Sequence, residues 1–576
     1  MSLKELISVA RGAIPADSLL KNARIVNTFI GEIEQADVAI YGDKIAGVGD
    51  YDKAKEIIDL QGRFLAPGLI NGHTHIESSM LHPARYAQAV VPKGTLTVAT
   101  DLHEIANVCG TEGIKFVTDL ARQLPLDMLF MAPSCVPATH LETPGARIST
   151  KEVKKIMAHP KIIGLGEMMN FPGVITGDEE ILKKISASKG KIIDGHAPGL
   201  AGNELNAYMS AGILSDHEST TLEEGKEKLR RGMYLMIREG SSEKNLDALL
   251  PLVTDNTYRR CLFVVDDRSC SDLLWEGDID AVVRKAIERG LDPIRAIQMA
   301  TINAAEYFRL YDRVGIGPGY IANLITINDL DKLKIDMVFY RGKLVAKEGK
   351  PLFPLPPVTL ELRDTVHIKP IMGKSLKIPL PRQERLSEGE TSEETYPVME
   401  IVPGQIVTKK VIEKVKVVDG VVMPDLKRDI LKLVVVERHK ASGNIGVGLV
   451  KGFGLKKGAL ASSVAHDSHN IIALGANDFD ILKAIEEINR LQGGLVICDN
   501  LEILASLPLP IAGLLSPEPL DVVASQHEIV EKTAASLGNL PPAPFAILSF
   551  LALPVIPELR LTDLGLVDVE ELRLIR

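Results

Sequence analysis

The chain has 576 residues, which is too long for a single hydrophobic core, and its 45% hydrophobic and 25% charged residues are typical of a globular protein. The net charge is -10 and no basic cluster is interleaved with aromatic residues, which argues against nucleic acid as a partner. The five cysteines are scattered, no run of about 18 apolar residues occurs and no leader pattern opens the chain, so we expect a cytoplasmic protein without disulfides or membrane spans.

The first 65 residues combine a helical pattern with short strands. An amphipathic run within residues 1–20 predicts a helix that packs on the body of the protein. Short β runs with Gly/Asp turns follow, at residues 23–27, 33–41 and 44–48. Because so small a sheet is not a complete domain, it needs further strands. Residues 313–350 contain similar β runs with glycine turns and are the candidate partner.

Residues 66–312 alternate apolar β runs with helical patterns, which indicates a parallel α/β architecture. Most of the candidate strands end in His, Asp or Glu. They end at His73-Thr-His75, Thr100-Asp-Leu-His103, Pro133-Ser134, Gly166-Glu167, Asp194-Gly-His196, Asp216-His217, Ile237-Arg-Glu-Gly240 and Val265-Asp-Asp267. Eight strands are what a TIM-type barrel needs, and in such barrels the chemistry takes place at the carboxyl ends of the strands.

The run from Phe64 to Glu77 organises this region, because it ends in a His-x-His pair. In an extended strand, residues two apart point the same way, so His73 and His75 project together, with Glu77 beside them if the strand continues. Two adjacent imidazoles at a strand end form half of a transition-metal site. For so short a motif, two polar histidines in a surface turn are the alternative.

The remainder of the chain divides into a connection and a second domain. Residues 351–400 are rich in proline and then acidic, with the stretch Arg385–Glu394 poor in apolar residues, so we expect an extended connection with an exposed loop. Residues 401–576 return to an α/β texture. The predicted elements are strands at 405–408, 431–436 and 495–498 and an amphipathic helix at 478–491 that ends at Gly493-Gly494.

The His-x-His pair that follows Ala66-Pro-Gly-Leu-Ile-Asn-Gly72, together with the acidic and histidine residues at later strand ends, resembles the amidohydrolase superfamily. Members are metal-dependent hydrolases and deaminases. The resemblance implies a (β/α)8 TIM-type barrel over residues 66–312, with the flanks 1–65 and 313–350 joined in one small β-sandwich domain. The expected fold class is therefore α/β, with a C-terminal α/β domain over residues 401–576.

The resemblance also implies a binuclear metal site. Many members carry a carboxylated lysine at the end of strand four, where this chain has Glu167, a carboxylate that can itself bridge two cations. A surface ion pair is the alternative role for Glu167. His196 and His217, on the next two strand ends, match the family's ligand pair for the second metal. Imidazole and carboxylate ligands without a thiolate suit Mn or Fe(II), and also Zn.

The last predicted ligand comes from strand eight, which ends in Asp266 and Asp267. Because successive residues of a strand face opposite ways, only one of them can be the ligand. We predict Asp266 as ligand and as acceptor of the proton of the metal-bound water. Asp267 would then bind substrate or orient Arg268.

Further motifs resemble the adenine deaminases of bacteria and archaea. They are His73-Thr-His-Ile-Glu-Ser-Ser-Met80, Ala99-Thr-Asp-Leu-His-Glu-Ile-Ala-Asn107, Gly166-Glu-Met-Met-Asn-Phe-Pro-Gly173, Asp194-Gly-His-Ala-Pro-Gly199, Arg238-Glu-Gly-Ser241, Val264-Val-Asp-Asp-Arg268, Ser462-Ser-Val-Ala-His-Asp-Ser-His-Asn-Ile471 and Leu509-Pro-Ile-Ala-Gly-Leu514. The resemblance covers nearly the whole chain. It implies hydrolytic deamination of adenine to hypoxanthine and ammonia, with metal-activated hydroxide attacking the purine C6 and a carboxylic acid protonating the ring near N1.

Several side chains are candidates for contacting the purine. Glu77 is predicted to contact the ring or the nucleophile, although it could simply order its strand. His103, on the same face of an extended segment as Asp101, could line the pocket or hold a ligand histidine in its tautomer. Arg238 and Ser241 are predicted to close over the base from the loop after strand seven. The remaining candidates are Asp267, Glu104 and His469.

The segment His466–Asn470 is rich in ligand-type side chains. It could reach the active site from the C-terminal domain, reach that of a neighbouring subunit, form a buried polar turn or hold a separate metal at His466 and His469. The competing function is that of another amidohydrolase acting on a cyclic amide or a related 6-substituted purine, and a non-catalytic scaffold is the third reading. We expect adenine and water as the small-molecule partners and a homo-oligomer, a dimer or higher.

Overall fold

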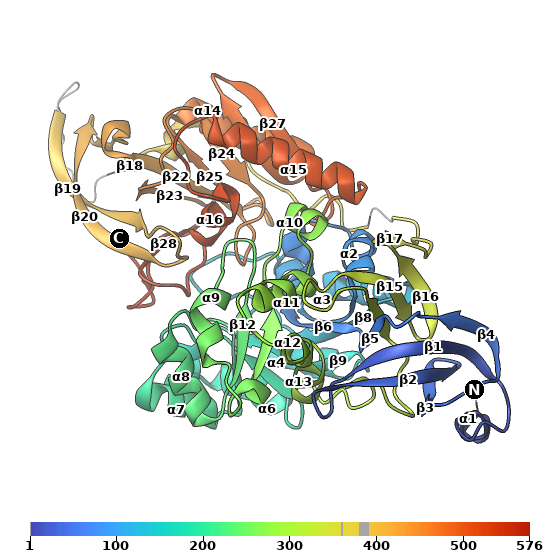
Figure 1. Ribbon diagram of the computed structural model, residues 1–576. Helices are drawn as coiled ribbons and strands as arrows, with labels where there is room; N and C mark the ends of the chain where they lie inside the picture. The colour runs from blue at the N-terminus through green and yellow to red at the C-terminus, as the bar shows by residue number, and fades with distance from the viewer. Residues whose placement is uncertain (1, 359–360, 380–390, 576) are drawn as a thin grey trace.

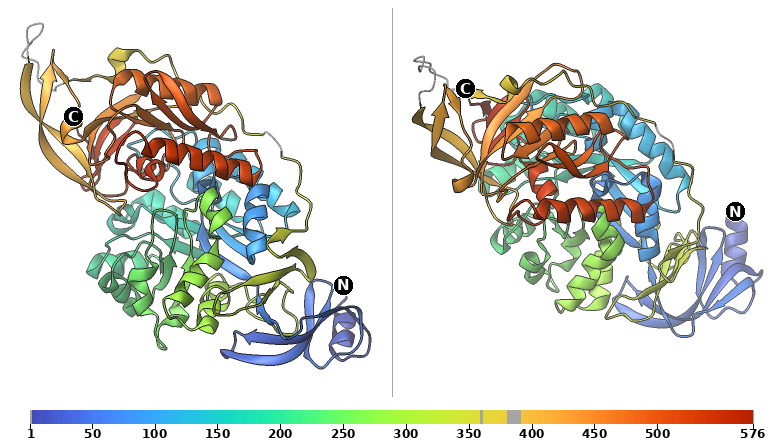
Figure 2. Two further views of the ribbon diagram at one scale, coloured as in Figure 1. Left: turned by 45° about the horizontal axis from the view of Figure 1, so that its top comes forward. Right: turned by 90° about the horizontal axis from the view of Figure 1, so that it is seen from above.

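The computed structural model describes residues 2–358, 361–379 and 391–575 and shows three regions (Figure 1). A β sheet near the N-terminus lies on one side of a central parallel region, and the C-terminal region lies over another side of it; the two views of Figure 2 agree on this arrangement. None of the helices in these ranges is long and apolar enough to cross a membrane.

The first sheet is built from both flanks of the central region. Its order is β17-β16-β15-β14-β5-β1-β2-β3, with β4 paired to β1. The central junction is antiparallel and pairs Leu324 with Pro67 and Ile327 with Phe64. The elements are α1 Leu3–Ala10, β1 Ala16–Asn27, β2 Glu32–Tyr41, β3 Lys44–Gly49, β4 Ala54–Asp59, β5 Phe64–Pro67, β14 Leu324–Ile327, β15 Ile335–Tyr340, β16 Lys343–Lys347 and β17 Lys350–Pro351. Segments more than 250 residues apart therefore close one sheet.

The central region is an α/β structure with a curled parallel sheet. Five strands pair in the order β10-β9-β8-β7-β6 and three in the order β11-β12-β13, all parallel. A parallel bridge between Thr74 and Asp266 connects β6 to the segment that follows β13. The strands are β6 Leu69–Thr74, β7 Thr95–Asp101, β8 Asp127–Ala132, β9 Ile162–Met168, β10 Ile192–Gly195, β11 Ser215–Asp216, β12 Tyr234–Arg238 and β13 Cys261–Val264.

Helices follow these strands, as the alternation of patterns predicted. They are α2 Pro83–Val90, α3 His103–Leu120, α4 Thr150–Met157, α5 Phe171–Thr176, α6 Glu179–Ala187, α7 Gly202–Ser210, α8 Leu222–Arg231, α9 Leu246–Leu249, α10 Cys270–Trp275, α11 Ile279–Glu288, α12 Pro293–Met299 and α13 Ile302–Tyr307, with 3-10 turns η1 Ile76–Ser79, η2 Val91–Lys93, η3 Ala121–Gln123, η4 Leu250–Leu252 and η5 Tyr258–Arg260. All seven residues of β7 are buried, which is expected of a parallel strand covered on both faces.

The C-terminal region contains a ten-stranded sheet of order β18-β21-β20-β19-β23-β22-β25-β24-β26-β27 and a three-stranded sheet β28-β29-β30. The elements are η6 Gly373–Leu376, β18 Ile378–Pro379, β19 Thr391–Ile401, β20 Thr408–Val418, β21 Val421–Val422, η7 Leu426–Arg428, β22 Ile430–Val436, β23 Ile445–Lys451, β24 Ala459–Ser462, β25 Ile471–Gly475, α14 Asp478–Leu491, β26 Gly494–Asp499, β27 Glu502–Pro508, α15 Leu520–Ala535, α16 Pro544–Phe550, β28 Leu559–Thr562, β29 Gly565–Asp568 and β30 Arg573–Leu574.

The structure differs from the sequence expectations at the start of this region. Residues 391–400, predicted as part of an extended connection, form most of β19, which pairs with β20 along its whole length. The polar composition of this segment did not predict a strand. Hydrogen bonding to β20 stabilises it as one. Most of the acidic stretch Arg385–Glu394 lies outside the described residues. The predicted strand at 405–408 is also wrong, because β20 begins only at Thr408.

The C-terminal region is fixed to the carboxyl ends of the parallel strands. The backbone N–H of Ser516 donates to Met80 O at 2.8 Å, and Thr562 Oγ1 donates to Leu141 O at 2.6 Å. The amide of Asn470 donates to Thr143 O at 3.0 Å. Apolar residues of both regions share one continuous buried core. Side chains from both regions therefore meet at the ends of the strands.

Candidate metal centre and active site

His73 and His75 lie at the end of β6 and both turn Nε2 toward the same point. Their Nε2 atoms are 3.4 and 3.1 Å from Asp266 Oδ1. The backbone carbonyl of Asp101 lies 3.2 Å from His75 Nδ1, and Asp194 Oδ2 lies 3.7 Å from His73 Nδ1. These contacts orient both rings. A histidine that ligates a metal usually bonds a carboxylate or carbonyl through its other ring nitrogen in this way.

Glu167, in β9, lies between two groups of histidines. Its Oε1 is 3.1 Å from His75 Nε2, and its Oε2 is 2.7 Å from His196 Nδ1 and 3.3 Å from His217 Nε2. Burial by itself would raise the pKa of Glu167, but the bonds from the three histidines hold it well below its usual range. A carboxylate with one oxygen toward each group is suited to bridging two cations.

Glu218 is a member of the cluster that the sequence analysis missed. Its Oε1 is 3.5 Å from His196 Nδ1 and 3.3 Å from His217 Nε2. Arg238 donates to Glu218 at 2.6 and 3.1 Å and to Asp266 Oδ2 at 2.7 Å. The sequence signal for Glu218 was its position immediately after His217, at the end of a strand. In barrel enzymes the catalytic residues come from the carboxyl ends of strands.

The donor atoms fit a divalent metal centre. Four imidazoles and three carboxylates are buried together, and the ligand atoms of His73, His75 and Asp266 lie within 4.8 Å of one another, as do those of His73, Glu167 and His217. The buried nitrogens His73 Nε2, His196 Nε2 and His217 Nδ1 have no hydrogen-bond partner. Although burial opposes it, the carboxylates raise the pKa of His75 and His217 well above the usual value, and the same negative charge would hold a cation.

The two aspartates after β13 point to different neighbours. Asp266 adopts a left-handed backbone conformation, with φ of 59°, which turns its carboxylate toward His73 and His75. Asp267 accepts a hydrogen bond from Ser78 Oγ and lies 3.8 Å from His466 Nε2. Because β13 ends at Val264, a local turn rather than strand alternation separates the two carboxylates.

Glu77 does not lie beside the two histidines. β6 ends at Thr74, and Glu77 belongs to the 3-10 turn η1, so the expected alternation stops before it. Its Oε1 accepts a hydrogen bond from the backbone N–H of Ile105 at 3.2 Å, near the beginning of α3. Burial and the charge of Glu104 raise the pKa of Glu77 to about 7. Glu77 therefore supports the start of α3 through Oε1, and its predicted contact with the ring or the nucleophile stays a prediction.

His103 and Glu104 open α3 rather than ending a strand. Both line the pocket at the metal cluster, and His103 Nδ1 lies 3.5 Å from Asp101 Oδ2 and 3.7 Å from Glu167 Oε1. His103 Nε2 lies 3.3 Å from Glu104 Oε1. The pairing of His103 with Asp101 predicted from sequence is thus present, although a helix start and not an extended segment brings it about.

Arg238 and Ser241 line two different spaces, Arg238 the pocket at the cluster and Ser241 a neighbouring cavity. Arg238 is the last residue of β12, is 2% exposed and is held by Glu218 and Asp266. Ser241 Oγ donates to Asp272. The sequence placed Ser241 correctly in the loop after β12, but not Arg238, because a sequence pattern does not locate the last residue of a strand.

The segment after β24 reaches the cluster within the same chain. His466 and Asp467 line the pocket at the candidate metal cluster, which we call the metal pocket, and His466 Nδ1 lies 2.7 Å from Glu104 Oε1. His469 contacts the other oxygen of Glu104 from behind, so it supports Glu104 and is not among the residues that line the pocket. His466 is therefore the member of this segment closest to the chemistry, and the prediction for His469 is corrected.

The comparisons with known proteins agree with this geometry. The family model "Amidohydrolase family" matches residues 64–345, and the model "Adenine deaminase C-terminal domain" matches residues 405–573. The chain is 58% identical to the adenine deaminase of Dehalococcoides mccartyi over 575 residues, which cover 100% of this chain and 99% of the relative. It is 50% identical to adenine deaminase 2 of Carboxydothermus hydrogenoformans and 48% identical to the adenine deaminase of Halalkalibacterium halodurans, each over 98% of this chain and 98% and 97% of the relative.

Proposed function

The chain belongs to the adenine deaminase family within the amidohydrolases, and we propose that it hydrolyses adenine to hypoxanthine and ammonia. The observation that carries the proposal is the buried cluster in which Glu167 lies between His73 and His75 on one side and His196 and His217 on the other. The alternative, another amidohydrolase acting on a cyclic amide, is not favoured, because the C-terminal domain and the full-length relatives both point to adenine deaminases.

We propose that the cluster holds two divalent cations, Mn or Fe(II), with Zn as the alternative. His73, His75 and Asp266 would hold one, His196 and His217 the other, with Glu167 shared between them. When bound, the cations would supply Lewis acidity that lowers the pKa of water from about 15.7 to about 7. Elemental analysis of protein purified in Mn(II), with two ions per chain expected, tests this occupancy.

The residues of the chain then move protons and fix geometry. Asp266 is the proposed general base: it faces the histidines through Oδ1 while Arg238 holds Oδ2 at 2.7 Å. The bond from water oxygen to C6 forms and the C6–N bond breaks. One proton of water ends on ring N1 and the other leaves with the amine as ammonia. Asp267, at the edge of the pocket, is placed to bind the ring near N1.

We also propose that the eight strands β6–β13 form a (β/α)8 barrel. The bridge between Thr74 and Asp266 and the bond from Gly195 N–H to Ser215 Oγ at 3.1 Å connect the two parallel sheets at both junctions. The domain division proposed is residues 1–65 with 313–350, residues 66–312 and residues 401–576, with 351–400 as connection.

A homo-oligomer remains a prediction that light scattering in solution can test.

The experiment that tests the function measures ammonia release and the ultraviolet change when adenine is added to Mn(II)-loaded protein. Adenosine and dihydrouracil serve as comparison substrates. Turnover of adenine that is lost in His73→Ala supports the proposal. Absence of adenine turnover in protein shown to contain metal, or faster turnover of dihydrouracil, would falsify it.

A further inference from the structure

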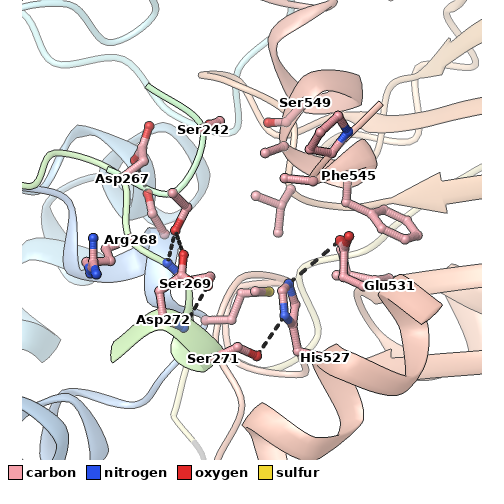
Figure 3. Close-up of a pocket in the computed structure, with 18 of the residues that line it drawn as sticks. Ser242, Asp267, Arg268, Ser269, Ser271, Asp272, His527, Glu531, Phe545 and Ser549 are labelled. Atoms are coloured by element: carbon pink, nitrogen blue, oxygen red, sulfur yellow. Dashed lines mark hydrogen bonds and ion pairs between the residues drawn. The ribbon is translucent and has the colours of Figure 1, made fainter. Parts of the chain in front are cut away.

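A cavity of about 410 Å³ lies between the central region and the C-terminal region. The loop around Ser241, the segment Asp267–Ser269 and the start of α10 form one wall, and residues of α15 and α16 form the other. Figure 3 shows these two walls facing each other, with Asp267 and Ser269 on one side and Phe545 and Glu531 on the other. The proton transfers of the proposed reaction take place at the metal cluster, outside this cavity.

The cavity adjoins the metal pocket. Asp267, His466 and Phe550 line both spaces, so these three side chains form their common wall. The ring of His466 stacks on that of Phe550 with centroids 4.5 Å apart and planes inclined by 18°. His466 Nε2 lies 3.8 Å from Asp267 Oδ2. Polar atoms at this wall are therefore within reach of a molecule in either space.

The sizes of the two spaces decide which can hold a substrate ring. The metal pocket has a volume of about 30 Å³, enough for roughly two water molecules. The neighbouring cavity lies within the range of roughly 300–1,000 Å³ typical of small-molecule sites. The larger cavity has room for a bicyclic ring system, whose reacting edge would then face the pocket at the cluster.

The lining of the cavity suits a neutral planar heterocycle. Aromatic and apolar side chains from the C-terminal region form much of the wall: Val464, Leu495, Phe545, Ala546 and Phe550. The faces of aromatic rings and purines attract each other through dispersion and stacking. Phe545 is 5% exposed in the whole chain, so its ring is held by surrounding residues and does not need to be ordered by the ligand.

A polar group lies at another part of the same cavity. His527 Nδ1 is 3.0 Å from Ser271 Oγ, and its Nε2 is 3.9 Å from Glu531 Oε1. Burial lowers the pKa of His527, and burial together with the charge of Asp272 raises that of Glu531 to about 7. Both side chains can form hydrogen bonds to the polar atoms of a ring in the cavity.

We propose that this cavity is the compartment that holds the purine ring, with Phe545 and Phe550 against the ring and its amino-bearing edge directed past Asp267 and His466 to the metals. The inference rests on the proposed function and adds a substrate site formed mainly by the C-terminal region. It gives that region a defined task, binding and orienting the base, while the central region carries the metals.

The test uses the full metal-loaded chain and two substitutions that alter the cavity. Phe545→Ala removes a proposed ring contact, and Ala546→Trp fills the space. Each is expected to raise KM for adenine about tenfold with kcat changed by less than about twofold and with unchanged metal content. Phe545→Leu keeps the apolar volume without the flat ring and serves if the alanine variant does not fold. Ala535→Trp, on the exposed end of α15, is the matched control with wild-type kinetics.

Calorimetric binding of adenine to chelator-treated protein separates the compartment from the reaction. Weaker binding by about tenfold in Phe545→Ala supports the compartment even if the wild-type protein with metal fails to release ammonia, an outcome that would sink only the proposed reaction. Wild-type KM and wild-type affinity in both Phe545→Ala and Ala546→Trp, with normal turnover, would overturn the compartment. A fall in kcat at constant KM in these variants would overturn it as well.

Discussion

The two sides of the active site are built by different means. On the side of the central region, imidazoles and carboxylates are buried in direct contact, as His75, Glu167 and Asp266 show, and they come from the ends of parallel strands. On the C-terminal side, a turn after β24 contributes His466, and a short helix contributes Phe545 and Phe550, which offer mostly apolar surface. The first side fits metal binding and proton transfer; the second fits binding of a planar base.

This difference predicts how substitutions divide. Changes on the central side remove charges from a buried network, so they should lower metal content and kcat together. Changes on the C-terminal side remove contacts made equally in ground and transition states, so they should act mainly through KM.

Removal of metal should have the largest effect. Treatment with a chelator is expected to abolish adenine deamination and lower Tm, because a ligand that binds only the folded state stabilises it. Added Mn(II) should restore both. Assays of ammonia release and thermal unfolding, before and after metal return, check this. Full activity in protein shown to be metal-free would contradict a metal-binding role for the central side of the site.

Glu167→Gln keeps the shape of the side chain but removes the charge between the two histidine groups. We expect kcat to fall on the order of a thousandfold and at least one metal ion to be lost, because the shared ligand oxygen is gone. Elemental analysis and steady-state kinetics measure both. Glu179→Gln, at an exposed site of α6, is the control and should behave as wild type. Normal metal content with normal kcat in Glu167→Gln would contradict the bridging role.

Arg238→Met removes the guanidinium that holds Glu218 and Asp266. The expected result is a fall in kcat of about a hundredfold with a smaller loss of metal affinity. The reason is that Arg238 orients the carboxylates without binding the metal itself. Metal titration and kinetics separate the two quantities. A variant that changes only KM would place Arg238 on the substrate instead, as the sequence first suggested.

His469→Asn tests the C-terminal side without touching the pocket lining. His469 contacts Glu104, which in turn bonds His466 at 2.7 Å. Loss of this support should lower kcat/KM about tenfold at constant metal content. Kinetics combined with metal analysis check it, and loss of metal would show that the two sides are not separable.

The smallest expected effect concerns stability and pH. Burial and the charge of Asp467 raise the pKa of Glu142 to about 8 from an ordinary value of 4.5. A raised acid pKa means that the folded state binds the extra proton, so the contribution of Glu142 to stability is full below 4.5 and is lost as the pH rises to about 8. Glu142→Gln should therefore gain a few degrees in Tm over wild type at pH 8 relative to pH 5. An equal difference in Tm at both pH values would contradict it.

Much of the central side could be read from the sequence. His73, His75, Glu167, His196 and His217 are all found together, because each lies at or just after the carboxyl end of a buried strand and parallel strands end at one edge. The predicted alternation does not extend to Glu77, because β6 stops at Thr74. Such local boundaries depend on packing that sequence patterns do not record.

By itself the sequence determined the α/β class, the family and the residues at strand ends, since these follow from periodicity and short motifs that act locally. Only the tertiary structure decided the rest. It placed Glu218 and Arg238 in the charge network, turned Asp266 rather than Asp267 toward the histidines and brought His466 more than 350 positions along the chain to Glu104. Contacts of this kind arise when distant segments pack together, and their geometry is set by the three-dimensional arrangement of the whole chain.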